Sequence, residues 1–250
     1  MNPFRQLKRY LIYKLRPKID IDSTSTNFKE LDLDQIFKYF GCNKATEVLD
    51  QSSVGHGYSK FYEKYLNSYK NKKINILEIG SFAGASAASF VKYFPDSNVY
   101  CLDINLTNFK YTSKKIKVFG MDVSKKGMID NFYSKIKILK DNEFFDIIID
   151  DGSHKLSDIL SSLGNFYKNL KPGGFYIIEE FKYPNFFPHL NDCDEVKIDE
   201  LLNCLKDKKN FKSKIIDEKN IQYILNYTKN ISTHTGLVEN SDIAFIEKLN

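Results

Sequence analysis

The chain has 250 residues, 42% of them hydrophobic and 14% aromatic, and a formal net charge of +5. This length and composition fit one large globular domain, or a core with an appendage, and exclude a disordered chain. The positive charge suits anionic ligands such as nucleotides, but it is too modest and dispersed to indicate nucleic-acid binding. No apolar run approaches the length of a membrane span, and no signal peptide is visible.

The four cysteines, at positions 42, 101, 193 and 204, show no Cys-x-x-Cys spacing. Cys101 lies in an apolar run and is expected to be a core thiol. We therefore expect reduced cysteines and a cytoplasmic protein.

The segment Phe4–Lys18 has apolar residues at helical spacing with basic residues between them, and Pro17 ends it. This pattern favours a helix that packs on the body of the protein or on another subunit, as in a homo-oligomer. A helix that lies on a membrane surface is the alternative. The polar stretch Ile19–Asn27 that follows is predicted to be a linker.

Two further helices are predicted at Leu31–Cys42 and Tyr58–Lys70. The loop between them carries His56 between two glycines, ahead of an aromatic helix. A histidine in such a loop can be inert. However, a loop directly before the first strand of a sheet can fold over the open edge of a ligand cleft, so His56 and Tyr58 are candidate ligand contacts.

The chain is organised around Ile74–Gly84, where an apolar, β-branched run leads through a glycine turn into a predicted helix, Ala85–Tyr93. Strand, glycine turn and helix open a nucleotide-binding α/β unit, because glycine lets a ligand approach the backbone and the helix start offers free N–H groups. Phe82 replaces the second glycine of the dinucleotide fingerprint, so the motif is Glu78-x-Gly80-x-x-x-Gly84. A packing turn in another α/β protein is the alternative.

Strands and helices alternate through the rest of the chain, which predicts a doubly wound, mostly parallel α/β sheet. A helix is expected to run up to Lys168, and Ile221–Tyr227 and Ile231–Val238 are each left open between strand and helix. The other predicted elements are the strands Asn98–Ile104, Lys117–Asp122, Phe144–Asp151, Phe175–Ile178 and Asp242–Lys248, and the helices Ser124–Lys140 and Asp192–Lys209.

Acidic residues stand at the carboxyl ends of the predicted strands, where ligands bind in sheets of this kind. Asp103 can accept hydrogen bonds from both hydroxyls of a ribose. Met121 and Asp122 end the next strand, where an adenine ring would lie. This convergence is the main reason to expect a ligand site at this edge.

A second acidic cluster follows the strongest strand signal, where Asp150 and Asp151 lead into Gly152-Ser153-His154, and Glu179 and Glu180 end the next strand. Carboxylates gathered together repel one another unless a cation neutralises them. Oxygen ligands favour Mg²⁺, Mn²⁺ or Ca²⁺ over zinc. The alternative is that some of these acids face solvent or accept hydrogen bonds from nearby backbone N–H groups. His154 is either a general base or an orienting or capping residue.

With these motifs the chain resembles the class I S-adenosylmethionine-dependent methyltransferases. More narrowly, it is similar to metal-dependent sugar O-methyltransferases of the mycinamicin type and to bacterial capsule heptose methyltransferases. The resemblance covers about residues 56–180 and is specific through the order and spacing of its parts. The matching stretches are His56-Gly57-Tyr58 with Tyr62, Leu77–Gly80, Phe94-Pro95, Leu102–Ile104, Gly120–Asp122, Ile149–His154 and Leu170–Glu180.

The resemblance implies a Rossmann-like, seven-stranded sheet over residues 71–250, preceded by a helical extension and cofactor-covering loop over residues 1–70. It implies that His154 and Asp151 are catalytic and that Asp151, Glu179 and Glu180 bind a divalent metal, Mg²⁺ or Mn²⁺. The residues it assigns to S-adenosylmethionine are His56, Tyr58, Glu78, Gly80, Ser81, Gly84, Asp103, Ile104, Met121, Asp122 and Asp150.

The chain departs from the family pattern at three places. Leu49-Asp50-Gln51 stands where the family often has Thr-Asp-Lys, Glu180 stands where an aspartate is more common, and Ala85 replaces a frequent glycine. The longer Glu180 can change the metal geometry, so that only one residue of the pair binds.

The function implied is methyl transfer to a sugar hydroxyl, with a nucleotide-activated heptose or hexose for capsule or surface polysaccharide as the expected acceptor. A methyltransferase of another small metabolite is one alternative. A nicotinamide-dependent sugar oxidoreductase is another, but its Tyr-x-x-x-Lys pattern recurs by chance in a chain this rich in Tyr and Lys. The third is a non-catalytic cofactor-binding scaffold, which would not need the second acidic cluster.

Overall fold

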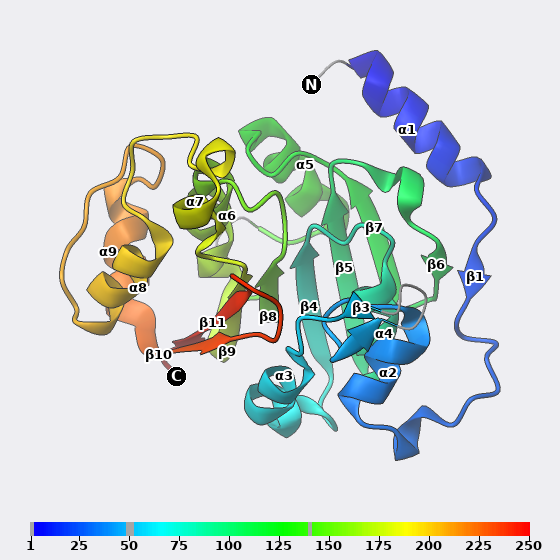
Figure 1. The fold of residues 1–250 in the computed structure, drawn as a ribbon. Helices are drawn as coiled ribbons and strands as arrows, with labels where there is room; N and C mark the ends of the chain where they lie inside the picture. Colours follow the sequence, from blue (N-terminus) through cyan, green and yellow to red (C-terminus); the bar gives the residue numbers. More distant parts are fainter. Residues whose placement is uncertain (1–2, 49–52, 140–141) are drawn as a thin grey trace. The chain divides into compact units, whose positions relative to one another are not determined.

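The computed structural model describes residues 3–48, 53–139 and 142–250 (Figure 1). The family departure at Leu49-Asp50-Gln51 lies outside the described residues. The chain divides into two compact units, the first ending at Asp122 and the second beginning at Val123. This division does not bear on the boundary near residue 70, which stays a prediction.

The first unit contains three parallel strands with helices before and between them. Its helices are α1 (Pro3–Leu15), η1 (Phe28–Glu30), α2 (Leu33–Phe40), α3 (Ser59–Leu66), η3 (Asn67–Tyr69), α4 (Ala85–Tyr93) and η4 (Leu106–Asn108). Its strands are β1 (Ile19–Asp20), β2 (Glu47–Val48), β3 (Ser53–Val54), β4 (Ile74–Ile79), β5 (Ser97–Asp103), β6 (Tyr111–Thr112) and β7 (Ile116–Gly120).

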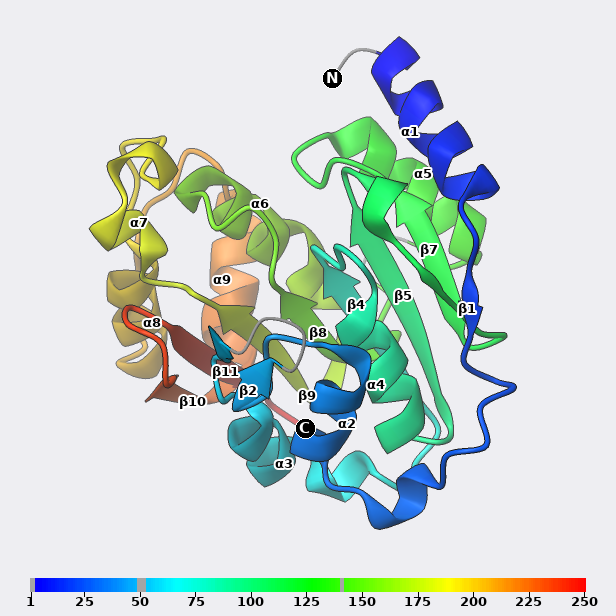
Figure 2. The ribbon, with the colours of Figure 1, turned by 45° about the vertical axis from the view of Figure 1, so that its right-hand side comes forward.

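Three of these strands, β4, β5 and β7, are parallel and lie side by side in the large sheet (Figures 1 and 2). Their carboxyl ends are aligned, since Asp103 is in register with Gly120 and the N–H of Gly80 donates to Leu102 O at 2.8 Å. The predicted bounds of β4 and α4 are confirmed, because an apolar run and a glycine turn mark them locally.

The prediction that Ile19–Asn27 is only a linker is wrong. Ile19 and Asp20 form β1, which pairs in parallel with Tyr111 and Thr112 of β6, and Ile21 is buried. Pairing with a strand so far along the chain leaves no signal in a polar stretch.

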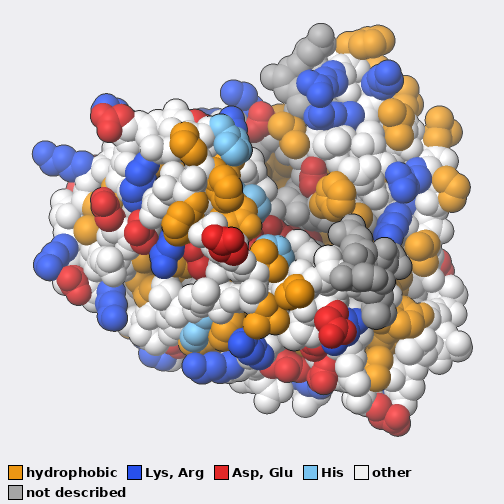
Figure 3. All heavy atoms as spheres, viewed as in Figure 1, with side chains coloured by type: hydrophobic (Ala, Val, Ile, Leu, Met, Phe, Trp, Pro, Cys, Tyr) orange, Lys and Arg blue, Asp and Glu red, His pale blue; other side chains and the backbone are white. Residues whose placement is uncertain are grey.

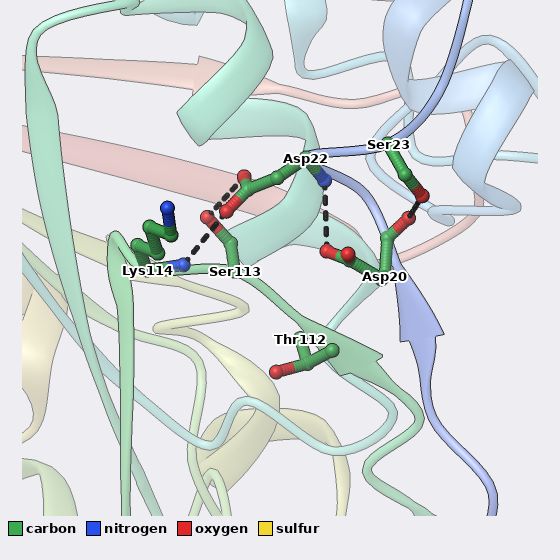
Figure 4. A pocket seen from close by; sticks show the side chains of 6 residues that line it. All are labelled: Asp20, Asp22, Ser23, Thr112, Ser113 and Lys114. Atoms are coloured by element: carbon green, nitrogen blue, oxygen red, sulfur yellow. Dashed lines mark hydrogen bonds between the residues drawn. The ribbon is translucent and has the colours of Figure 1, made fainter.

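A pocket of about 580 Å³ lies beside this pairing, and Figure 4 shows the six residues that line it. Asp22 fastens the segment there, accepting hydrogen bonds from Ser113 Oγ at 2.7 Å and from the N–H of Lys114 at 2.9 Å. The segment from Ile19 to Asp22 is therefore bound to residues 111–114 of the first unit.

The second unit contains two parallel strands followed by two antiparallel ones. Its helices are α5 (Lys126–Ile136), α6 (Leu156–Phe166), η5 (Tyr167–Asn169), α7 (Tyr183–Phe186), η6 (Pro188–Leu190), α8 (Ile198–Lys206) and α9 (Glu218–Tyr227). Its strands are β8 (Phe145–Asp150), β9 (Leu170–Glu179), β10 (Thr228–Thr235) and β11 (Asp242–Lys248).

In the second unit β8 and β9 are parallel, and β11 lies antiparallel between β9 and β10. Together with β4, β5 and β7 these strands make up a mostly parallel sheet of seven strands, which confirms the predicted fold class. β9 begins at Leu170, earlier than predicted. Its pairing with β8 shifts between Leu170 and Phe175, and Gly173 adopts a φ of 70° within this bulge.

The ambiguous stretches near the carboxyl end are a helix and a strand. Ile221–Tyr227 belongs to α9, whose first turn is capped by the Asp217 side chain accepting from Asn220 N at 2.9 Å. Ile231–Val238 overlaps β10, which pairs with β11. Among the described residues, no helix has the length and apolarity needed to cross a bilayer.

Candidate active site

Three ligand-type side chains meet in the second unit, at the carboxyl ends of β8 and β9. One potential ligand atom from each of Asp151, His154 and Glu180 lies within 4.8 Å of the other two. His154 Nε2 is 3.7 Å from Asp151 Oδ1, and His154 Nδ1 is 4.0 Å from Glu180 Oε2. Asp151 and His154 are partly exposed and Glu180 is buried, so the group opens to solvent on one side.

Two members of this triad have an unusual backbone conformation. His154 has a φ of 55° and Glu180 a φ of 50°, in the left-handed region that favours glycine. Such a conformation costs about 1–3 kcal/mol and persists where the surrounding structure enforces it, often at functional sites. Here the N–H of Glu180 donates to Asp242 O at 2.7 Å, and the N–H of Lys182 donates to Asp242 Oδ1 at 3.3 Å.

Asp242, the first residue of β11, thus fixes the turn that presents Glu180 to the triad. Its carboxyl is buried, and burial raises its pKa to about 6 although the N–H of Lys182 opposes the shift. In the sequence, Asp242 stands out only as the first residue of a predicted strand. No local pattern distinguishes an aspartate that supports a turn in another part of the chain.

Asp150 ends β8, and its side chain points away from solvent. Burial raises the pKa of this carboxyl to about 8, and the negative charge of Asp151 acts in the same direction. Within the described part of the chain, Asp150 Oδ2 has no hydrogen-bond partner. Its assignment to the methyl donor stays a prediction.

Aromatic side chains lie beside the triad along α7 and η6. The ring of Tyr183 meets that of His154 edge to face with centroids 5.4 Å apart, and Phe187 packs against Tyr183 at 5.1 Å. His189 lies 6.2 Å from Phe187, and Phe186 is half exposed. Burial, with the negative charge of Glu180, raises the pKa of Tyr183 to about 12, so its phenol is neutral.

In the first unit the glycine turn and Asp103 are joined by direct hydrogen bonds. Asp103 accepts from Phe82 N at Oδ2 (2.7 Å) and from Asn105 N at Oδ1 (2.6 Å), while Asp103 O accepts from Met121 N at 2.9 Å. These bonds hold the ends of β4, β5 and β7 together. A carboxylate oxygen can accept more than one hydrogen bond, so Asp103 is chemically suited to accept from ligand hydroxyls.

Buried polar groups form hydrogen bonds within and next to the glycine turn. Glu78 is fully buried and accepts a hydrogen bond from the Ser86 hydroxyl, and Ser81 Oγ donates to Glu78 O at 3.3 Å. Gly84 N donates to Ser81 O at 2.7 Å, which closes the turn at the start of α4. The motif residues Glu78, Ser81 and Gly84 therefore form one local hydrogen-bonded unit, and their contact with a cofactor stays a prediction.

Substitution of Gly84 by alanine is expected to lower the free energy of unfolding by about 2–4 kcal/mol. Gly84 has a φ of 80°, and an added Cβ would lie 2.6 Å from Phe109 Cζ. Chemical denaturation measures the loss. Gly127→Ala is the matched control, because its Cβ meets nothing within 4 Å and the site is helical, so this variant should keep or slightly gain stability. Equal stability of both variants would contradict the strain argument.

His56 and Tyr58 also belong to the first unit. Their rings lie 5.2 Å apart, and the backbone N–H of His56 donates to Asn43 O at 2.7 Å. Tyr58 is fully buried, and its N–H donates to Lys44 O at 2.8 Å. The loop thus pairs with residues 43–46, and its predicted contact with a cofactor stays a prediction.

Comparison with known proteins decides the fold. No family model matches the chain. The structure of MycE methyltransferase from the mycinamycin biosynthetic pathway, in complex with Mg and SAH, superimposes with a TM-score of 0.66 at 22% identity, covering 88% of this chain and 55% of that one. The chain has a class I methyltransferase fold. The complex that also holds mycinamycin VI gives a TM-score of 0.67 at 21% identity, covering 90% and 56%.

Curated proteins of similar sequence are O-methyltransferases that act on glycosylated compounds. The mycinamicin VI 2''-O-methyltransferase of Micromonospora griseorubida is 27% identical over 132 residues, 50% of this chain and 31% of that protein. The L-olivosyl-oleandolide 3-O-methyltransferase of Streptomyces antibioticus is 28% identical over 140 residues, 53% of this chain and 34% of that protein. The chain resembles these sugar O-methyltransferases, and it spans about a third of their length.

Within the methyltransferase fold, the predicted residues separate into two groups. Glu78, Gly80, Ser81, Gly84, Asp103, Ile104, Met121 and Asp122 line the turn and the ends of β5 and β7 in the first unit. In the second unit, Asp151 and Glu180 join His154, whereas Glu179 is not a member of the triad. Glu179 is buried within β9 in register with Ile243, so its assignment as a metal ligand stays a prediction without support from the geometry.

Phe82 is a residue of the methyltransferase fold whose position the sequence did not suggest. The sequence marks it only as a missing glycine, yet it has a φ of 42°, is 64% exposed and donates its backbone N–H to Asp103 Oδ2. A non-glycine residue rarely adopts this conformation, and the hydrogen bond to the carboxylate of Asp103 holds Phe82 in it. The signal in the sequence that could have indicated this unusual position is an aromatic residue in the middle of a glycine turn.

Proposed function

We propose that the chain is an S-adenosylmethionine-dependent O-methyltransferase that acts, with a divalent cation, on a hydroxyl of a sugar. The observation that carries this proposal is the triad of Asp151, His154 and Glu180 at the strand ends of a methyltransferase fold. The similarity to macrolide-sugar O-methyltransferases supports it.

The methyl donor is assigned to the first unit. Asp103 offers two carboxylate oxygens to the ribose hydroxyls, and the turn from Gly80 to Gly84 leaves backbone room for the methionine end. Phe82 and Ile104, both exposed, offer apolar contact beside Asp103. The similar structure of MycE methyltransferase in complex with Mg and SAH supports this class of ligand.

The donor set of the triad fits a hard divalent cation. Asp151 and Glu180 supply carboxylate oxygens, the ligands that Mg²⁺ and Mn²⁺ prefer, and His154 supplies a nitrogen that Mn²⁺ also accepts. The buried position of Glu180 favours a charge partner, because a buried carboxylate is costly without one. A bound cation would lower the pKa of a nearby alcohol and thereby ease loss of its proton.

The protein side chains then have defined tasks. His154 receives the proton of the acceptor hydroxyl, and Asp151, 3.7 Å from its Nε2, orients the imidazole. Methyl transfer needs the acceptor oxygen in line with the sulfonium carbon and the departing sulfur, so holding the acceptor supplies much of the rate. Tyr183 and Phe187 form an apolar wall beside His154 against which a sugar ring can pack.

The acceptor we favour is a small molecule that carries a sugar. The relatives are named for methylation of glycosylated compounds, among them an 8-demethyl-8-alpha-L-rhamnosyl tetracenomycin-C. The nucleotide-activated heptose or hexose of a capsule pathway and the cytoplasmic location stay predictions from the sequence. The aromatic wall suits any of these sugars, so the acceptor has to be found by experiment.

A methyl-transfer screen tests the function. The protein is incubated with S-adenosylmethionine, Mg²⁺ or Mn²⁺, and a panel of free sugars, nucleotide sugars and sugar-bearing polyketides, and release of S-adenosylhomocysteine is measured. We expect release that depends on one class of sugar and on the cation. Binding of the methyl donor without turnover on any class, for both metals, would favour a scaffold. Turnover on an amine or carboxylate acceptor would contradict the sugar assignment.

A further inference from the structure

Helix α1 is attached to the first unit by its polar face. Arg9 Nη1 donates to Ile104 O at 3.0 Å, and Arg16 Nη1 donates to Thr107 O at 2.8 Å. Between them Tyr13 meets the Phe109 ring edge to face at 6.2 Å. Positions 9, 13 and 16 share one side of a helix, so this side faces the loop that follows β5.

The opposite side of α1 is apolar and exposed. Leu7, Leu11 and Leu15, spaced four residues apart, lie on one face and are 55%, 50% and 83% exposed. Figures 1 and 2 show α1 at the periphery of the first unit. Amphipathic helices of globular proteins ordinarily bury their apolar face. Helix α1 has the reverse orientation, because its apolar face is exposed to solvent.

Basic side chains flank the exposed leucines. Lys8 and Lys14 lie on either side of the line from Leu7 to Leu15 on the helix surface, and both are exposed. Figure 3 shows basic and hydrophobic side chains next to one another over α1. Residues 1–18 contain no aspartate or glutamate, so the surface has a single sign of charge.

The arrangement of leucines and lysines on α1 distinguishes between two binding partners for its exposed face, a second copy of the chain and an anionic membrane. Two copies of α1 packed through their leucines would bring Lys8 and Lys14 of one copy towards those of the other, with no acidic residue in the segment to neutralise them. An anionic membrane surface meets both demands, because acyl chains accept the leucines while lysine ammonium groups reach the headgroups. Removal of the leucines from water and attraction of the lysines then act together.

We propose that the exposed face of α1 docks on the surface of an anionic membrane. The face consists of Leu7, Leu11 and Leu15 with Lys8 and Lys14 beside them. Through Arg9 the docked helix is joined to Ile104, the residue that follows Asp103. Docking therefore holds the first unit at the membrane by the loop that carries the proposed ribose acceptor.

Vesicle co-sedimentation tests the proposal with the full chain. Vesicles of phosphatidylcholine with 30% phosphatidylglycerol are compared with vesicles of phosphatidylcholine alone. We expect binding to the anionic vesicles only, and a marked loss of binding in 0.5 M salt. The L7S/L11S variant should bind at least tenfold more weakly.

The matched control is Leu237→Ser, which removes a leucine of similar exposure (52%) from the loop between β10 and β11 and should leave vesicle binding unchanged. Circular dichroism of each variant confirms folding. Failure of the wild type to bind anionic vesicles would overturn the proposal, as would unchanged binding by L7S/L11S. Leu11-dependent self-association in light scattering, with no vesicle binding, would assign the face to a second copy instead.

Discussion

Asp151→Asn should reduce methyl transfer by roughly a thousandfold, because the loss of several kcal/mol of cation-assisted stabilisation corresponds to about this factor. The substitution keeps the size of the side chain but removes a carboxylate from the triad with His154 and Glu180. The variant also loses the group that orients the imidazole, 3.7 Å away. The rate is measured as S-adenosylhomocysteine released under saturating methyl donor.

A matched control for Asp151→Asn lies in β8, the strand that directly precedes Asp151. Asp146 lies near the start of β8, where its carboxylate pairs with Lys171 at 2.9 Å, so Asp146→Asn should keep nearly full activity. Calorimetric affinity for S-adenosylmethionine should be unchanged in Asp151→Asn, because Asp103 and the glycine turn belong to the first unit. Full turnover of Asp151→Asn, or of the wild-type protein after exhaustive EDTA treatment, would refute the metal assignment.

Asp103→Ala should weaken binding of S-adenosylmethionine by about a hundredfold, as expected for two lost charge-assisted hydrogen bonds of 1.5–3 kcal/mol each at the lower end of that range. The carboxylate has two roles that disappear together. In the proposed function it offers acceptors to the ribose, and in the structure it accepts from Phe82 N and thereby holds the glycine turn. Titration calorimetry on the folded variant measures the change.

Asp96→Ala is the matched control for Asp103. Asp96 is exposed in the turn before β5, at the opposite end of the strand that Asp103 terminates, and its substitution should leave the affinity within twofold. An unchanged affinity in Asp103→Ala would exclude this residue from the methyl-donor site.

Local signals in the sequence were sufficient for the elements that surround the site. The apolar run of β4, the glycine turn and the helix Ala85–Tyr93 have the predicted bounds, and so does the final strand, Asp242–Lys248. Each of these elements is marked by its own residues. The pairing of Ile19 with Tyr111 was missed because the partner lies far along the chain.

The triad shows where sequence reasoning about a site stops. Successive residues of a strand point to opposite faces, so Glu179 and Glu180 were unlikely to reach the same ion as regular strand residues. Glu180 joins the triad because its backbone turns to a φ of 50°, and that turn depends on hydrogen bonds to Asp242. Neither the turn nor its support is visible in the order of the residues.

The hydrogen bond from Glu180 to Asp242 has a consequence for synthesis of the protein. A ribosome that has just added Glu180 must add all residues up to β11 before the partner of Glu180 exists, which takes roughly 3–12 s at ordinary elongation rates. Until β11 inserts between β9 and β10, Glu180 cannot form the hydrogen bond to Asp242 O that supports its costly conformation. In the nascent chain the turn from Gly80 to Gly84, proposed to hold the methyl donor, can therefore form early. The triad of Asp151, His154 and Glu180 can form only later, after β11 has been synthesised.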